Sequence, residues 1–289
     1  MVIDPGRSIA CWSNNSTRTN GGSLRDLRVR GRPGTFPFLN VQHHDSNMQL
    51  SNNKILITGG ASGIGFAMAE RFVAEGNTVI ICGRRADALA DAAKAVPSLI
   101  TRQCDLSKSE ERVALFAWVA AEHGDTNVLV SNAGIQQWMS VEDDDFFQRA
   151  MDEININVTA PLHLTSLFLK LKSLTTIINV TSGLSFVPMV KTPVYPATKA
   201  FFHSFTVALR ELVHARNIEV IEAIPPALNT DLGGKGLHDF APPVSEFIAS
   251  IFAQLKEGKI ALTFGFTEAL SQAGQEVIGP IFKRLNQLN

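Results

Sequence analysis

Two side chains spaced four residues apart, Tyr195 and Lys199, form an unusual pair for a helix. Residues at this spacing lie one turn apart on the same helix face, so a phenol and an ammonium would be neighbours. A nearby cation favours the phenolate, so the pair predicts a Tyr195 pKa below its ordinary value. Such a tyrosine can give or take a proton near neutral pH. Ser182 lies upstream at the end of an apolar run typical of a buried strand, and adds a hydroxyl.

A glycine-rich turn follows the first β-branched run of the chain and opens a helical stretch. The run is Lys54–Thr58, a helix is expected over residues 66–75, and a second strand over residues 78–82. Glycines at the first turn of such a βαβ unit let the backbone approach a pyrophosphate, and the helix N-terminus supplies N–H donors. The alternative is a glycine-rich turn without a ligand, but the position between strand and helix favours dinucleotide binding. The residues expected to contact the dinucleotide here are Thr58, Gly59, Ser62, Gly63, Ile64 and Gly65.

The glycine spacing from Gly59 to Gly65, which reads GxxxGxG, and the Tyr195 and Lys199 pair together resemble the short-chain dehydrogenase/reductase (SDR) superfamily. The resemblance extends over about residues 52–235. It implies an α/β fold of the Rossmann type, with a doubly wound, mostly seven-stranded parallel sheet flanked by helices. Within the superfamily, three further segments are similar to the DltE-like oxidoreductases: residues 83–85, 182–188 and 224–226.

The resemblance also implies a catalytic tetrad. Tyr195 would donate or accept the proton, Ser182 would bind the same substrate oxygen, and Lys199 would favour the tyrosinate and hold the cofactor ribose. Asn157 aligns with the helix asparagine of the family and would organise a water beside Lys199. Asn155 lies two residues earlier, and either asparagine is able to cap or turn the helix. The implied catalytic residues are Asn157, Ser182, Tyr195 and Lys199.

Other motifs occur in the order found in the superfamily, each at the end of an expected strand. Residues 104–106 end the third strand, where the family's aspartate contacts the adenine, and residues 132–134 end the fourth. Residues 225–230 follow the sixth strand, where relatives carry Pro-Gly and then a threonine that holds the nicotinamide amide. Pro226 replaces that glycine here. The resemblance adds these cofactor contacts: Asp105, Leu106, Asn132, Ala133, Gly134, Tyr195, Lys199, Pro225 and Thr230.

The residues after the second expected strand indicate which nicotinamide cofactor binds. A carboxylate at this point binds the ribose 2′-hydroxyl of NAD and repels a 2′-phosphate. Here the strand ends in Gly83, Arg84 and Arg85, and Asp87 lies further into the next helix. Because a guanidinium offers a fork of donors that fits a phosphate, these cofactor-binding residues favour NADP(H), with Arg84 as the main contact and NAD(H) possible. The alternative is a pair of solvated arginines at the start of a helix.

Composition limits the remaining classes of protein. The chain has 289 residues, 45% apolar and 18% charged, which are values of a globular protein with a sizeable core. A net charge of −1 argues against a nucleic-acid-binding body, and no apolar run is long enough to predict a transmembrane helix. The three cysteines form no CxxC pair, so a reducing, cytoplasmic location is predicted. The histidines show no metal-ligand spacing, so no metal site is expected.

Residues 1–50 differ from the rest and are expected to form a disordered extension to a single SDR-type domain over residues 51–289. They contain six arginines, no lysine and no glutamate. An upstream start to the reading frame, with Met48 as the alternative start, would also explain this composition. Two sharper alternatives are a mitochondrial transit peptide and an AT-hook-like arm at residues 30–33. A secretory signal is disfavoured, because no continuous apolar core follows the N-terminus.

The segments expected to line the substrate pocket are mostly apolar. They are residues 135–138, residues 184–194 and the chain after Pro226, which leads into a substrate lid at about residues 227–257. Because they contain no arginine cluster, we expect an uncharged, partly apolar ketone, aldehyde or alcohol as the substrate. The alternative is that these side chains pack the lid and the core. The apolar residues concerned are Trp138, Leu184, Phe186, Val187, Met189, Val190 and Leu228.

The leading interpretation is an NADP(H)-dependent oxidoreductase that interconverts a carbonyl and a hydroxyl by hydride transfer, with Tyr195 as acid and base. The alternative is a catalytically silent protein that senses a dinucleotide for regulation or scaffolding. Relatives commonly form homodimers or homotetramers through the helices that carry Asn157 and Tyr195. The apolar side chains expected to be exposed on these helices are Leu162, Leu164, Phe201, Phe202 and Phe205.

Overall fold

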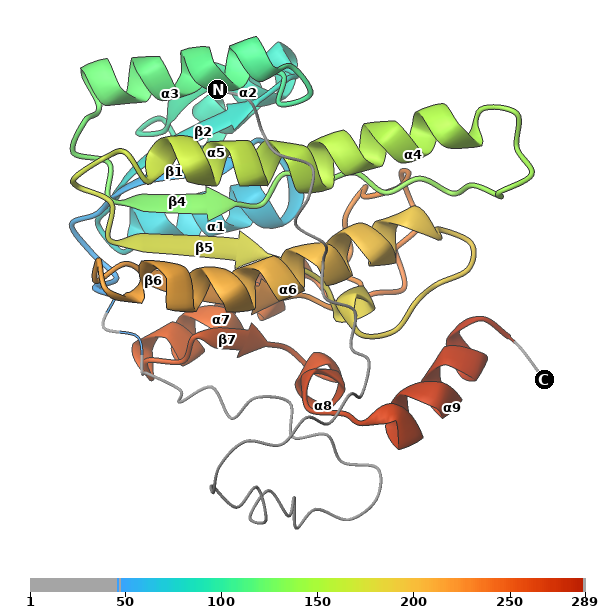
Figure 1. Ribbon diagram of the computed structural model, residues 1–289. Coiled ribbons are helices and arrows are strands. Elements are labelled where there is room, and N and C mark those ends of the chain that lie inside the picture. The colour runs from blue at the N-terminus through green and yellow to red at the C-terminus, as the bar shows by residue number, and fades with distance from the viewer. Residues whose placement is uncertain (1–45, 47, 288–289) are drawn as a thin grey trace, which may run out of the picture. The chain divides into compact units, whose positions relative to one another are not determined.

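Within residues 46 and 48–287, which the computed structural model describes, short apolar runs form one seven-stranded parallel sheet (Figure 1). The strand order is β3-β2-β1-β4-β5-β6-β7. The strands are β1 (Lys54–Thr58), β2 (Thr78–Gly83), β3 (Ile100–Gln103), β4 (Val128–Ser131), β5 (Thr176–Val180), β6 (Glu219–Ile224) and β7 (Ala261–Thr263). Every neighbouring pair is parallel, which confirms the predicted Rossmann-type arrangement.

Helices cover both faces of the sheet. They are α1 (Gly63–Ala74), α2 (Ala86–Ala95), α3 (Ser109–Glu122), α4 (Phe146–Ile154), the π-helical η1 (Asn155–Thr159), α5 (Ala160–Phe168), the 3₁₀-helical η2 (Gly183–Ser185), α6 (Val194–His214), α7 (Val244–Lys256), α8 (Thr267–Ser271) and α9 (Gln275–Leu285). Side chains of α1, α2 and α7 share one buried core with the sheet, and those of α3, α5 and α6 share the other. Strands covered on both faces need apolar residues at every position. In β1, for example, Ile55 and Ile57 face the first core and Leu56 faces the second.

Helix α1 starts earlier than the sequence predicts. We expected a helix over residues 66–75, and α1 begins at Gly63, inside the glycine motif. Ser62 is in an extended conformation just before it, so the turn runs straight into the helix. Further along, Phe72 of α1 meets Phe252 of α7 edge to face, with ring centroids 4.7 Å apart. This contact packs α1 against α7 on the same face of the sheet.

Helices α4, η1 and α5 form one uninterrupted helical run with a π-helical segment in the middle. The residues that join them, Asn155, Thr159 and Ala160, all have helical backbone angles. A π-helical segment holds one extra residue in its turn, and such segments occur frequently at functional sites. This one contains Asn157, which is buried, while the Asn155 side chain turns away and donates to the Ser107 carbonyl oxygen at 2.8 Å.

Several sequence-based expectations concern residues that the structure does not describe. The disorder of the N-terminal extension, the transit peptide and the AT-hook-like arm all fall within residues 1–45, which lie outside the described residues. The substrate lid at about residues 227–257 stays a prediction; in its second half, Phe247 and Ile251 of α7 are fully buried in the core. Among the helices that the structure does describe, none combines the length and the apolar composition needed to cross a bilayer.

Candidate active site

The carboxyl ends of the central strands bring most of the predicted site residues to one edge of the sheet. The strand order reverses between β1 and β4, and ligands of open α/β sheets bind at such a switch point. Thr58 ends β1, Asn132 follows β4, and Ser182 follows β5. Thr58 ties two of these ends together, because its hydroxyl oxygen accepts from Asn132 N at 3.0 Å and from Ala133 N at 3.1 Å.

The glycine turn between β1 and α1 lies too close to its neighbours to carry side chains. A Cβ atom at Gly59 would lie 2.9 Å from Ala133 Cα, and one at Gly65 would collide with the Gly59 carbonyl oxygen. Gly59 also has a φ of +63°, which only glycine adopts without strain. Ser62 makes no capping hydrogen bond with its side chain, so it leaves the first N–H groups of α1 to an anion. This geometry fits the pyrophosphate of a dinucleotide.

A cavity of about 600 Å³ lies beside the end of β2. Its lining residues are Arg84, Arg85, Gln103, Asp105, Lys108 and Glu111. Lys108 and Glu111 form an ion pair at 2.9 Å, and Arg85 donates to Ser62 Oγ at 3.1 Å. Burial acts to raise the pKa of Asp105, but hydrogen bonds from Ser107 outweigh it and hold that pKa below its ordinary value. In this cavity Lys108 is therefore already paired with Glu111, and Asp105 is ionised. The two arginines line the same cavity.

Ser182, Tyr195 and Lys199 lie together at the end of β5, and all three are buried. The Ser182 side chain acts to lower the pKa of the Tyr195 phenol. Lys199 Nζ lies 5.7 Å from the centroid of the Tyr195 ring and donates to the Val180 carbonyl oxygen at 2.9 Å. The one-turn spacing on α6 thus produces the predicted phenol and ammonium pair, and η2 delivers the serine beside it.

Asn157 joins this group from the opposite helix. Its Nδ2 donates to the Ile135 carbonyl oxygen at 2.8 Å and to Thr198 Oγ1 at 3.1 Å, and its Oδ1 accepts from Ile135 N at 2.9 Å. A Cβ atom at Gly134 would lie 3.4 Å from Asn157 Oδ1 and 3.5 Å from Lys199 Nζ, so the glycine lets these residues approach each other. Of the two candidate asparagines, Asn157 is the one that faces the site.

Burial controls the protonation of the pair on α6. It raises the pKa of Tyr195 well above its ordinary value, and the Ser182 side chain only partly offsets this effect. Burial also lowers the pKa of Lys199, to about 8. Our expectation of a Tyr195 pKa below its ordinary value is therefore wrong for this geometry, because burial sets the direction of the shift. Both side chains lose hydration, and a medium of low polarity favours the neutral form of each.

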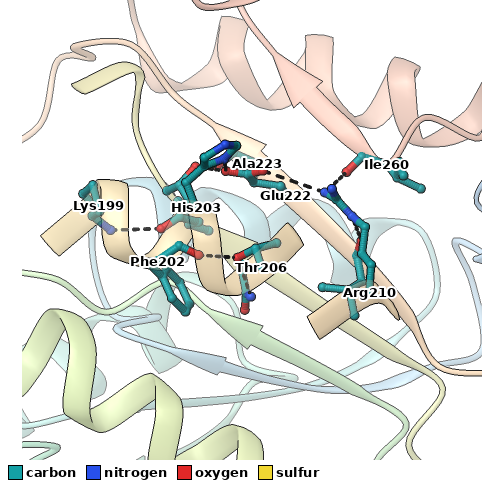
Figure 2. A network of polar contacts seen from close by, with 12 residues as sticks. Lys199, Phe202, His203, Thr206, Arg210, Glu222, Ala223 and Ile260 are labelled. Carbon is teal, nitrogen blue, oxygen red and sulfur yellow. Dashed lines mark hydrogen bonds and ion pairs between the residues drawn. The ribbon is translucent and has the colours of Figure 1, made fainter. Parts of the chain in front are cut away.

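A second polar network lies behind the pair, between α6 and β6 (Figure 2). Glu222 of β6 is buried, and its Oε1 lies 2.8 Å from His203 Nδ1 and accepts from the Thr181 hydroxyl at 2.7 Å. Arg210 approaches the other Glu222 oxygen at 3.8 Å. Because Thr181 immediately precedes Ser182, this network fixes the end of β5. This network was not predicted from the sequence. Two features could have indicated it: one acid within an apolar strand, and a histidine one turn after Lys199.

The substrate-side loops enclose a cavity of about 500 Å³. Its lining residues are Trp138, Met139, Ser140, Val141, Asp143, Val190, Lys191 and Pro193. Trp138 and Val190 were expected here, and both are partly exposed. Val187 and Leu228 are buried in the core instead, as the packing alternative predicted for part of this set. The lining is therefore partly apolar, with one carboxylate and one ammonium at its edge.

Comparisons with known proteins show the family and the fold. Residues 53–239 match the family model described as short chain dehydrogenase. An uncharacterised oxidoreductase, DltE of Bacillus subtilis (strain 168), is 39% identical over 249 residues, which cover 83% of this chain and 98% of the relative. A short-chain dehydrogenase from Streptomyces avermitilis has a TM-score of 0.69 at 26% identity, over 81% of this chain and 95% of its own. Another, from Burkholderia cenocepacia J2315 in complex with NADP, has a TM-score of 0.71 at 23% identity, over 82% and 99%.

Proposed function

The chain belongs to the short chain dehydrogenase family, and from that premise we propose that it is an NADP(H)-dependent oxidoreductase that interconverts a carbonyl and a hydroxyl group. The observation that carries the proposal is the buried cluster of Ser182, Tyr195 and Lys199, with the ammonium beside the phenol ring. A protein that only sensed a dinucleotide would have no need to bury a cation and a phenol together.

A bound nicotinamide would supply the hydride in reduction and accept it in oxidation. During reduction negative charge grows on the substrate oxygen, and the Tyr195 hydroxyl donates its proton to that oxygen. Ser182 donates a hydrogen bond to the same oxygen and orients it. The Lys199 ammonium then stabilises the tyrosinate that remains. Asn157 holds the Ile135 segment against α6, which keeps the substrate-side loop next to these groups.

The cofactor preference that we propose is NADP(H) over NAD(H). Arg84 and Arg85 line the cavity beside the end of β2, where a 2′-phosphate would need positive partners. The relative from Burkholderia cenocepacia, which shares the fold, was solved in complex with NADP. The glycine turn and the uncapped start of α1 would bind the pyrophosphate. The cavity lined by the two arginines would bind the 2′-phosphate. The adenine would lie near Asp105 and Leu106, and the nicotinamide near Pro225 and Thr230.

The substrate that we propose is a small ketone, aldehyde or alcohol without a net charge, because the substrate-side cavity is lined by Trp138, Met139, Val190 and Pro193. Asp143 and Lys191 at its edge leave room for a polar group on the substrate. We further propose a reducing, cytoplasmic location, since Cys82 and Cys104 are both free and buried.

The experiment is a panel of carbonyls and alcohols tested on the full chain, with NADPH absorbance as the readout. We expect turnover of at least one apolar carbonyl. Tyr195→Phe should lower kcat about a thousandfold, the scale of losing a positioned proton donor. NADPH binding by this variant, measured by fluorescence titration, should stay within a few-fold of the wild type. Turnover retained by Tyr195→Phe would contradict the proposed role, and NADPH binding without turnover of any substrate would favour the silent sensor.

A further inference from the structure

Glu153 of α4 carries a carboxyl group that is fully buried and that the proposed chemistry leaves unused. Its Oε1 accepts a hydrogen bond from the Gln137 backbone N–H. Its Oε2 is also buried and has no hydrogen-bond partner. Burying a carboxyl oxygen without a partner costs free energy, and native proteins rarely do so without a functional reason.

The position of Glu153 on α4 connects it to the substrate side of the site. Arg149, Glu153 and Asn157 follow one another at four-residue spacing, and all three bind the same loop. Arg149 exchanges hydrogen bonds with the Gln137 side chain, at 3.1 and 3.3 Å. Glu153 holds the Gln137 backbone, and Asn157 holds both backbone groups of Ile135. The carboxyl is thus the middle contact between α4 and the loop that reaches Trp138 in the substrate-side cavity.

The helix that carries Glu153 also packs against the helix of the proton donor. Helix α4 packs against α6, and the negative charge of Glu153 acts on the Tyr195 hydroxyl. The titratable groups coupled to Glu153 are Arg149 on its own helix and Tyr195 on α6. The loop contributes the uncharged Gln137. Burial raises the Glu153 pKa to about 7, against the opposing effects of the Gln137 N–H and the Arg149 charge.

We propose that Glu153 is a positioning residue for the reaction: one carboxyl oxygen fixes the substrate-side loop on α4, and the negative charge of the ionised carboxyl adds to the burial that keeps the proton on Tyr195. This inference rests on the proposed function, in which Tyr195 gives that proton to the substrate oxygen. Glu153 itself transfers no proton to the substrate. Because a neighbouring anion disfavours a tyrosinate, the ionised carboxyl sustains carbonyl reduction at higher pH and delays alcohol oxidation.

The variant Glu153→Gln separates the two roles. Glutamine has the same size and keeps an oxygen that accepts from the Gln137 N–H, but it has no charge. The matched control is Asp152→Asn, which removes a charge from the adjacent exposed residue, whose side chain binds Gln148. We expect the pH profiles of reduction and oxidation to move to lower pH by about one unit in Glu153→Gln, the scale of one charge on a buried neighbour. Asp152→Asn should leave both profiles unchanged.

A second readout needs no turnover. Tyr195 is the only tyrosine in the chain, so the ultraviolet absorbance of tyrosinate reports on this residue alone. The folded Glu153→Gln protein should form tyrosinate at lower pH than the wild type, with a shift that matches the rate profiles. Glu153→Met, which is also uncharged and close in length, serves if the glutamine variant does not fold.

The two readouts distinguish the failure of this inference from the failure of the proposed function. If the wild type turns over no substrate but Glu153→Gln still shifts the tyrosinate titration, the electrostatic link stands and the proposed reaction falls. If the wild type is active and the pH profile of Glu153→Gln superimposes on the wild-type profile, the inference is overturned. It is also overturned if the rate of the variant is lower at every pH but its profile keeps the wild-type position on the pH axis. An unchanged tyrosinate titration in Glu153→Gln or Glu153→Met also overturns it.

Discussion

Lys199 is a cation held with 4% of its surface exposed, and no carboxylate pairs with it among the residues that the structure describes. Its ammonium donates to the Val180 carbonyl oxygen, which replaces only part of its hydration. Burial therefore lowers the Lys199 pKa from 10.5 to about 8. The free energy behind this shift opposes folding at neutral pH, so the residue that the reaction needs is one that destabilises the fold.

We predict that Lys199→Met abolishes turnover and stabilises the protein by up to about 3 kcal/mol at pH 7, the free energy equivalent of the lowered pKa. Between pH 8 and 10.5 the unfolded lysine binds more protons than the folded one, so wild-type stability rises with pH across this window. The difference between the two proteins should therefore shrink as the pH rises. Urea unfolding of both proteins at pH 7 and pH 10 measures it. A variant less stable than the wild type at pH 7 would contradict the prediction.

The burial of individual side chains at the site was not predictable from the sequence. The types and spacing of Tyr195, Lys199 and Ser182 were enough to predict their meeting. The direction of the Tyr195 pKa shift was not predictable, because the desolvation comes from elements that are far apart in the chain. Glu153 and Glu222 escaped notice for the same reason: an acid in an apolar helix or strand is ordinary until its neighbours close over it.

At the scale of elements, the local sequence pattern predicted the glycine turn and the strands, but it did not predict the π-helical segment. A second strand was expected over residues 78–82, and β2 spans Thr78–Gly83. Apolar runs bounded by glycines predict such strands well. One extra residue within a helical turn leaves no trace in the apolar periodicity of α4 and α5. For that reason the choice of Asn157 over Asn155 rested on the family resemblance alone, and the π-helical backbone explains why Asn157 turns inward.

We predict that Asn157→Ala lowers kcat about a hundredfold, because the loss of its hydrogen bonds releases the Ile135 segment and a displacement near 1 Å can have that effect. NADPH affinity should change little. Asn155→Ala is the matched control: it removes one hydrogen bond, to the Ser107 carbonyl oxygen, and should cost about 1 kcal/mol of stability with kcat within twofold. Steady-state kinetics and urea unfolding of both variants test this assignment, and equal losses of kcat would refute it.

At the scale of the whole molecule, α4 and α6 present apolar side chains to solvent. Among the residues that we expected to be exposed, Phe201 is exposed. Leu164 and Phe202 are buried instead, because they lie on the inward-facing sides of α5 and α6. Leu212 adds a second exposed side chain to α6. It lies eleven residues after Phe201, close to three helical turns, so the two project from the same face. An apolar face on a long helix, next to the site, favours association between copies of the chain.

We predict that the full chain is a homodimer or homotetramer and that Phe201→Glu combined with Leu212→Glu lowers its mass in solution. Two charges on the shared face would have to be desolvated at each symmetric contact, which opposes assembly. Phe240→Glu is the matched control, since Phe240 is more exposed than either residue but lies outside α4, α5 and α6. Light scattering coupled to size exclusion measures the mass. Because η1, which continues α4, carries Asn157 and α6 carries Tyr195, dissociation should lower kcat as well. A monomeric wild type would exclude this interface.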